Sequence, residues 1–151
     1  MKLMKNMAMA TAVLIASPMM LAAPAIADEF PLVAGDYTSL TGIYVEDGGS
    51  MAYAKFLAGE WAKNQEFAIS KGWISGYNIY SNNDRRDGEP HLYLSQTFPS
   101  WPSGAEMERR NKEWEAFDTR SNAQLDAESG NRAKFRKVMG TITMQEYTIR
   151  K

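Results

Sequence analysis

Apolar residues recur at every third or fourth position between Met51 and Lys71. This spacing places them along one side of an amphipathic helix. Ser50 precedes the segment as a favourable N-cap, and Gly72 follows it, where a left-handed C-cap is commonly required. We therefore predict a long helix over residues 51–71.

A second helix is predicted to begin at Ser103. Glu106 stands three residues later, which is the spacing of a capping box. Apolar residues then recur at helical spacing as far as Phe117. The polar stretch 118–129 gives no clear pattern, and residues 131–139 are predicted as a further short helical piece.

Four segments rich in β-branched and aromatic residues predict strands. The dipeptide Asp87-Gly88 indicates a hairpin turn between the second and third of them. The four segments are residues 36–49 (a strand ending in a turn at Gly48-Gly49), 73–83, 91–98 and 141–149.

The resulting order is strand, helix, strand, strand, helix, strand. This order predicts an α+β fold of the ferredoxin-like βαββαβ type, in which two helices cover one face of a four-stranded antiparallel sheet. Residues 28–151 are expected to form this single domain.

Side chains alternate between the two faces of a strand, so each strand supplies two sets of residues. The apolar sets are expected under the helices, namely Leu92, Leu94, Phe98, Ile142 and Met144. The opposite face is expected to be polar but rich in tyrosine. Its members are predicted as His91, Tyr93, Ser95, Thr97, Thr141, Thr143, Gln145 and Tyr147, joined by Asn78, Tyr80, Ser39, Thr41 and Ile43.

The N-terminal segment is typical of a cleaved secretory signal peptide. Lys2 and Lys5 precede an apolar run, and Ala25-Ile26-Ala27 provides a small-residue cleavage site. We predict a signal peptide over residues 1–27 and a periplasmic protein that has no membrane segment after cleavage.

Composition excludes several classes of function. The chain has no cysteine, and loss of the two leader lysines lowers its formal charge from −1 to −3. Nucleic-acid binding would require a basic face, so we expect no nucleic-acid partner. With no cysteine, one histidine and no acidic loop of calcium-binding spacing, we predict no metal site and no bound cofactor.

His91 is the only histidine, and it stands at the start of a predicted strand. A general base needs a positioned partner, which the sequence does not indicate. We therefore interpret His91 as a strand-start residue that can contact a ligand, without a catalytic role.

The element order, the helix containing Trp61, the "DGEPHLYL" hairpin and the "RNKEWEAF" helix resemble the dimeric α/β-barrel superfamily. The resemblance is to exported members near the antibiotic-biosynthesis monooxygenase-like and NIPSNAP-like groups. It implies a homodimer in which the polar faces of two sheets close a barrel. It brings no catalytic motif, and fold does not imply function.

We predict a periplasmic protein that binds a mostly apolar or aromatic small molecule in a cavity between sheet and helices. One alternative is a cofactor-independent monooxygenase or isomerase that uses the same cavity. The other is a structural or stress-related dimer without a ligand. The predicted ligand-binding residues are Tyr93, Tyr147, Asn78, Tyr80, His91 and Thr143; whether any reaction is catalysed stays open.

Overall fold

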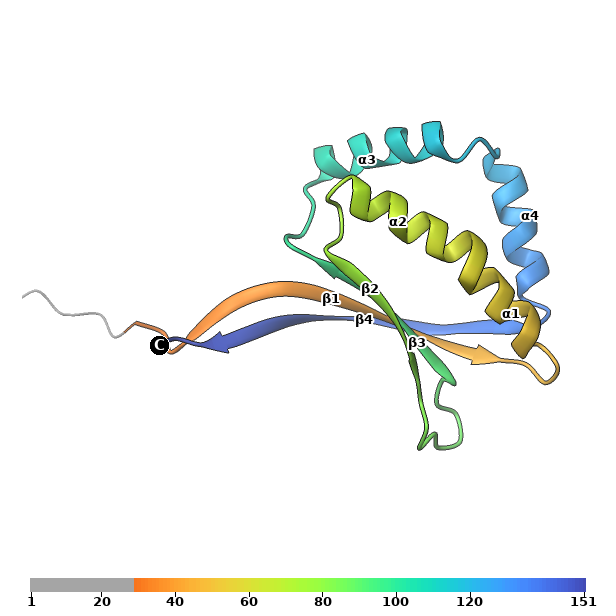
Figure 1. The fold of residues 1–151 in the computed structure, drawn as a ribbon, viewed down its shortest axis with the longest axis horizontal. Coiled ribbons are helices and arrows are strands. Elements are labelled where there is room, and N and C mark those ends of the chain that lie inside the picture. The colour runs from red at the N-terminus through yellow and green to blue at the C-terminus, as the bar shows by residue number, and fades with distance from the viewer. Residues whose placement is uncertain (1–28) are drawn as a thin grey trace, which may run out of the picture.

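The computed structural model describes residues 29–151, and the predicted signal peptide lies outside them. Four antiparallel strands form one sheet in the order β2-β3-β1-β4. They are β1 (Leu32–Val45), β2 (Gly76–Ser81), β3 (Leu92–Phe98) and β4 (Arg136–Ile149). Figure 1 shows β1 and β4 continuing together beyond β2 and β3 as a two-stranded ribbon. The α+β class and the four-stranded antiparallel sheet are confirmed, and the strand order is compatible with a ferredoxin-like fold.

The first crossover is one continuous helix made of α1 (Ser50–Phe56), the π-helical turn η1 (Leu57–Trp61) and α2 (Ala62–Ser70). The residues that face the core are four positions apart, namely Tyr53, Leu57, Trp61 and Gln65. In a regular α-helix, side chains four positions apart point in directions that differ by about 40°. The wider π-helical turn reduces this difference and keeps the four side chains on one side of the helix. As a result Tyr53, Leu57 and Gln65 are all buried, and Trp61 packs against the same core.

The sequence predicts the C-terminal end of this helix correctly and the N-terminal end wrongly. Gly72 has a φ of +66°, so its predicted C-cap role is confirmed. The N-cap is Gly49, and Ser50 is already helical, so the predicted Ser50 cap is wrong. A Cβ at Gly49 would lie 2.6 Å from the Phe135 carbonyl oxygen, which explains why glycine occupies the cap.

The second crossover contains α3 (Gly104–Phe117) and α4 (Asn122–Arg132). Ser103 caps α3 as predicted, because its hydroxyl accepts a hydrogen bond from the Glu106 N–H at 3.2 Å. The helical piece expected over residues 131–139 is wrong. Ser121 and Gln124 form a complete capping box that starts α4 earlier, and the chain from Arg136 onward pairs with β1.

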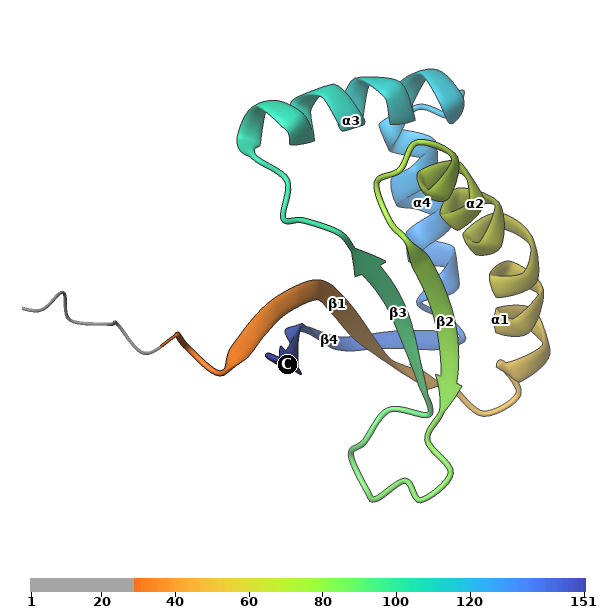
Figure 2. The same ribbon diagram turned by 60° about the vertical axis from the view of Figure 1, so that its left-hand side comes forward.

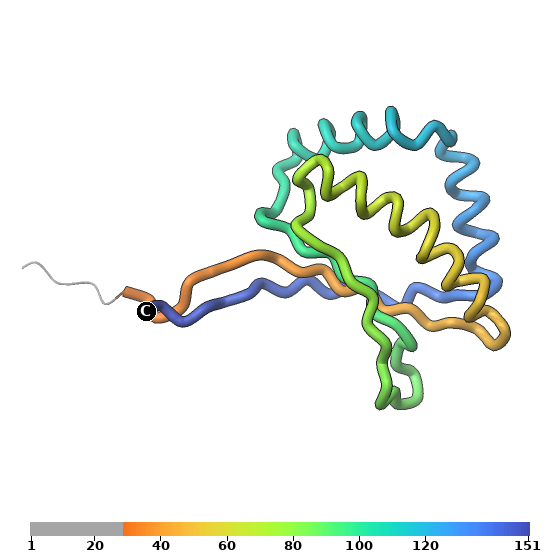
Figure 3. The backbone as a smooth tube through the Cα atoms, in the orientation of Figure 1, coloured from red at the N-terminus to blue at the C-terminus, as the bar shows by residue number. Residues whose placement is uncertain are grey.

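Both helices of the second crossover pack against the first helix. Phe117 of α3 stacks on Phe67 of α2 with ring centroids 3.9 Å apart, and Arg132 of α4 lies over the Phe56 ring of α1. Figures 2 and 3 show α4 returning beside the first helix toward the start of β4. Most of β4 is exposed, and the buried core lies between the first helix and strands β1 and β3.

Strand pairing corrects the predicted faces. Ser39 pairs with both Gln96 and Thr143, and Gln96 bonds Gln65 of α2, so these strand residues face the helix. By the same alternation, Ile43, Thr41 and Thr141 also face it, whereas the prediction placed them on the opposite side.

We call the side away from the first helix the open face. It carries Thr38, Leu40, Asn78, Tyr80, Tyr93, Ser95, Thr97, Ile142 and Met144. The prediction was therefore correct for β2 and β3 and wrong for β1 and β4, where Ile142 and Met144 were expected under the helices. A slip of one residue exchanges the two faces of a strand, and segments that mix threonine with isoleucine do not fix the register.

Candidate functional site

A cavity with mainly apolar walls, which we call the main cavity, has a volume of about 600 Å³. It lies between the first turns of the helix, the loop that follows β1, and the adjoining ends of β2 and β3. Its lining residues are Val45, Glu46, Asp47, Gly48, Ser50, Tyr53, Ala54, Leu57, Ala58, Ile79, Ser81, Asn82, His91 and Leu92.

Local structure explains why the walls are apolar. Tyr53 and Leu57 are one helical turn apart and project toward the sheet. Ile79 and Leu92 lie on the helix-facing side of β2 and β3, where they form the sheet side of the cavity. An apolar chamber with a few polar groups is the usual character of a small-molecule site.

The charged residues that line the main cavity are both acidic. Glu46 and Asp47 follow β1 and form no ion pair with a residue in the range 29–151. No lysine or arginine of residues 29–151 is among the lining residues. The local potential therefore disfavours an anionic ligand and admits a neutral or cationic one.

His91 joins β3 to β1 at this cavity. Its Nδ1 accepts a hydrogen bond from the Val45 N–H at 3.1 Å, and its ring packs on Tyr44 with centroids 4.5 Å apart. Its backbone N–H also donates to the Ile43 carbonyl oxygen. An accepting Nδ1 requires the proton of the neutral ring to sit on Nε2. These contacts give His91 a structural role, and its predicted contact with a ligand stays a prediction.

Asn82 and Ser81 line the main cavity, although sequence reasoning did not select them. The Asn82 side-chain N–H groups donate to the Glu89 carboxylate and the Pro90 carbonyl oxygen, both at 3.2 Å. The side-chain carbonyl oxygen of Asn82 accepts no hydrogen bond from residues 29–151 and can accept one from a ligand. Hydrogen bonds from the Arg86 backbone N–H and from Asn82 lower the pKa of Glu89. An asparagine just before a turn could have signalled this arrangement, because Asn commonly bonds nearby backbone in turns.

The six predicted ligand-binding residues do not converge on one site. Asn78, Tyr80 and Tyr93 share the open face, on the other side of the sheet from the main cavity. Thr143 faces the helix side from β4. The Tyr147 hydroxyl lies 3.4 Å from the Gln145 side-chain oxygen, on the ribbon. His91 alone among the six lines the main cavity.

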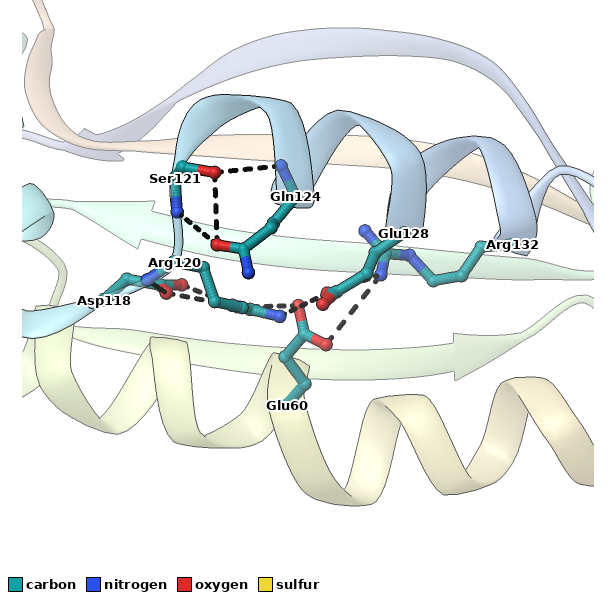
Figure 4. A network of polar contacts seen from close by, with 7 residues as sticks. All are labelled: Glu60, Asp118, Arg120, Ser121, Gln124, Glu128 and Arg132. Atoms are coloured by element: carbon teal, nitrogen blue, oxygen red, sulfur yellow. Dashed lines mark hydrogen bonds and ion pairs between the residues drawn. The ribbon is translucent and has the colours of Figure 1, made fainter.

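A network of charged side chains fastens α4 to the first helix (Figure 4). Arg120 donates to Asp118, to Glu60 of η1 at 3.1 Å and to Glu128 of α4. The guanidinium of Arg120 lowers the pKa of Asp118 to about 2. Because Arg120 is fully engaged by carboxylates, we interpret this network as structural.

Two features were not found within residues 29–151. Among residues 29–151, no group of three or more His, Cys, Asp or Glu side chains is placed to hold a metal ion. Within the same range, no helix is both long and apolar enough to cross a membrane.

Comparisons with protein-family models, curated proteins and solved structures found no match to this chain.

Proposed function

We propose that this protein binds a small, mostly apolar or aromatic molecule, neutral or cationic, in the main cavity. The observation that carries the proposal is the cavity of about 600 Å³, whose mainly apolar walls also include several polar groups. Binding pockets for small molecules typically have volumes of about 300–1,000 Å³ and this mixture of surfaces. The Asn82 carbonyl oxygen and the Ser81 hydroxyl would orient the ligand.

Nile red, a neutral aromatic dye whose fluorescence rises in apolar surroundings, is a suitable probe. Ala58 lines the main cavity, and Ala58→Trp would fill part of it. Ala116→Trp on exposed α3 is the matched control. We expect the Ala58 variant to lose dye binding and the control to retain it. Equal binding by both variants would overturn the proposal.

We also propose a homodimer that forms through the open face. Ile142 is 58% exposed and Met144 46% exposed, with Tyr80 nearby across the sheet. A contiguous apolar patch of this kind commonly marks an interface between proteins. Light scattering should give twice the monomer mass for the native protein and the monomer mass for Ile142→Lys. Thr143→Lys, on the other face of the same strand, should remain dimeric.

The location is the third proposal and rests on the sequence of residues 1–27. We propose export to the periplasm with cleavage after Ala27. N-terminal sequencing of protein recovered from the periplasmic fraction should begin at Asp28. Recovery of the uncleaved chain in the membrane fraction would contradict this location.

A further inference from the structure

A second, smaller cavity of about 210 Å³ lies farther along the same helix–sheet interface. Ile43, Phe56, Leu94 and Val138 form apolar parts of its wall. Tyr53 lines both this smaller cavity and the main cavity, so its side chain borders the two. At about 30 Å³ per water molecule, the smaller cavity has room for roughly seven waters.

The Tyr53 hydroxyl is the first of three polar groups at this cavity without a protein partner. The residue is only 2% exposed, and its hydroxyl makes no hydrogen bond within residues 29–151. The Tyr53 side chain is buried, but its hydroxyl is not among the fully buried polar atoms without a partner in this range, which are Trp73 Nε1 and Arg132 Nε, so the hydroxyl keeps an accessible surface. Because Tyr53 borders the cavity, a molecule bound there can supply a hydrogen-bond partner.

Arg136 is the second group. It is the first residue of β4, it is half-buried, and it forms no ion pair with a carboxylate of residues 29–151. Burial raises the pKa of Tyr53, while the positive charges of Arg136 and Arg132 oppose that rise. The phenol therefore lies within the field of these two arginines.

Two of the other polar side chains at the smaller cavity are already paired. The Thr41 hydroxyl lies 2.9 Å from the Thr141 hydroxyl, and the Gln96 amide donates to Gln65 at 2.6 Å. The groups left to meet a ligand are one cation, one hydroxyl and the indole N–H of Trp61, surrounded by apolar walls. All three can donate a hydrogen bond, and a carboxylate has the charge and the acceptor oxygens to receive them.

We propose that the smaller cavity is a binding site for a small organic monocarboxylate with an apolar or aromatic body. Arg136 holds one carboxylate oxygen, the Tyr53 hydroxyl donates to the carboxylate, and the body packs against Ile43 and Phe56. This site favours a negatively charged ligand, whereas the acidic residues of the main cavity disfavour one. The two cavities would therefore bind different molecules, and the carboxylate site does not depend on the ligand proposed for the main cavity.

Sodium benzoate is the probe, and benzamide is its neutral analogue of nearly the same shape. In ¹⁵N-resolved NMR titrations, benzoate should shift the amide resonances of Ile43 and Val138 and leave those of Ser81 and Asn82 unchanged. We expect a dissociation constant of about 1 mM or tighter and at least about tenfold weaker binding of benzamide. Absence of shifts, or equal binding of the two compounds, would overturn the proposal.

Two substitutions, each of which removes one positive charge, test the role of Arg136. Arg136→Gln should weaken benzoate binding at least about tenfold, since a charge-assisted contact is lost. Lys137→Gln removes the same charge from the neighbouring residue and should leave affinity unchanged. Equal loss in both variants would show a non-specific charge effect and refute the site. Unchanged Nile red binding in Arg136→Gln would show that the main cavity is intact.

Tyr53→Phe gives a second, independent test. It removes only a hydroxyl that makes no hydrogen bond within residues 29–151, so the variant should melt close to the native temperature. The same variant should bind benzoate several-fold more weakly. A lowered melting temperature together with unchanged benzoate affinity would show that the hydroxyl serves the fold and not a ligand.

Discussion

Removing the Asp118 carboxylate should loosen the attachment of α4 to the first helix. Asp118 accepts hydrogen bonds from Arg120 Nε at 2.9 Å, from Arg120 Nη2 at 2.6 Å and from the Arg120 backbone N–H at 3.1 Å. Its side chain is only 7% exposed. The substitution Asp118→Asn keeps the shape and removes the charge that Arg120 faces.

The magnitude follows from the pKa of Asp118, which falls from an ordinary 3.8 to about 2. One pKa unit corresponds to about 1.4 kcal/mol, which gives an upper value near 2.5 kcal/mol. Arg120 is 27% exposed, and solvent screening reduces the net effect to about 1–2 kcal/mol. We expect Asp118→Asn to lower the free energy of unfolding by this amount at pH 7.

The effect must also depend on pH in a defined direction. A carboxyl group with a lowered pKa in the folded state stabilises the protein above its unfolded-state pKa. That stabilisation is lost as the pH falls from about 4 through about 2. The difference in stability between the native protein and Asp118→Asn should therefore shrink over this interval.

Urea unfolding followed by circular dichroism at several pH values measures both quantities. Asp126→Asn is the matched control, because Asp126 is exposed on α4 and makes no ion pair within residues 29–151. The control should differ from the native protein by less than about 0.5 kcal/mol. A similar cost for both variants, or a cost for Asp118→Asn that does not vary with pH, would refute the reasoning.

Three further predictions concern single positions. Gly49→Ala should lower stability by about 1–3 kcal/mol in urea unfolding, because the added Cβ would lie 2.6 Å from the Phe135 carbonyl oxygen; an unchanged midpoint would show that this loop relaxes freely. The ¹⁵N spectrum of His91, the only histidine, should show the Nε2–H tautomer at pH 8, since Nδ1 accepts from Val45, and a protonated Nδ1 would contradict that contact. Tyr93→Phe should leave Nile red binding to the main cavity unchanged, because Tyr93 lies on the open face; a tenfold loss would place the ligand there instead.

The sequence by itself determined the features that depend on neighbours a few residues away. The long helix ending at Gly72 and the Ser103 cap follow from helical periodicity and capping chemistry. The strand at residues 92–98 follows from its residue types, and its alternation correctly assigned Leu94 to the core. Together these elements gave the α+β class, because their order allows few ways of covering one sheet.

Tertiary structure decided which face each long strand presents and which residues meet at a cavity. Ile43 became a core residue, and Ile142 an exposed one, through the pairing register of β1 with β4, which includes a shift between Gly42 and Ile43. Such a register depends on contacts between segments about a hundred residues apart, which no local pattern records. For the same reason Tyr53 and Arg136 meet at one cavity only in the folded chain: each looks like an ordinary helix or strand residue until the sheet brings them together.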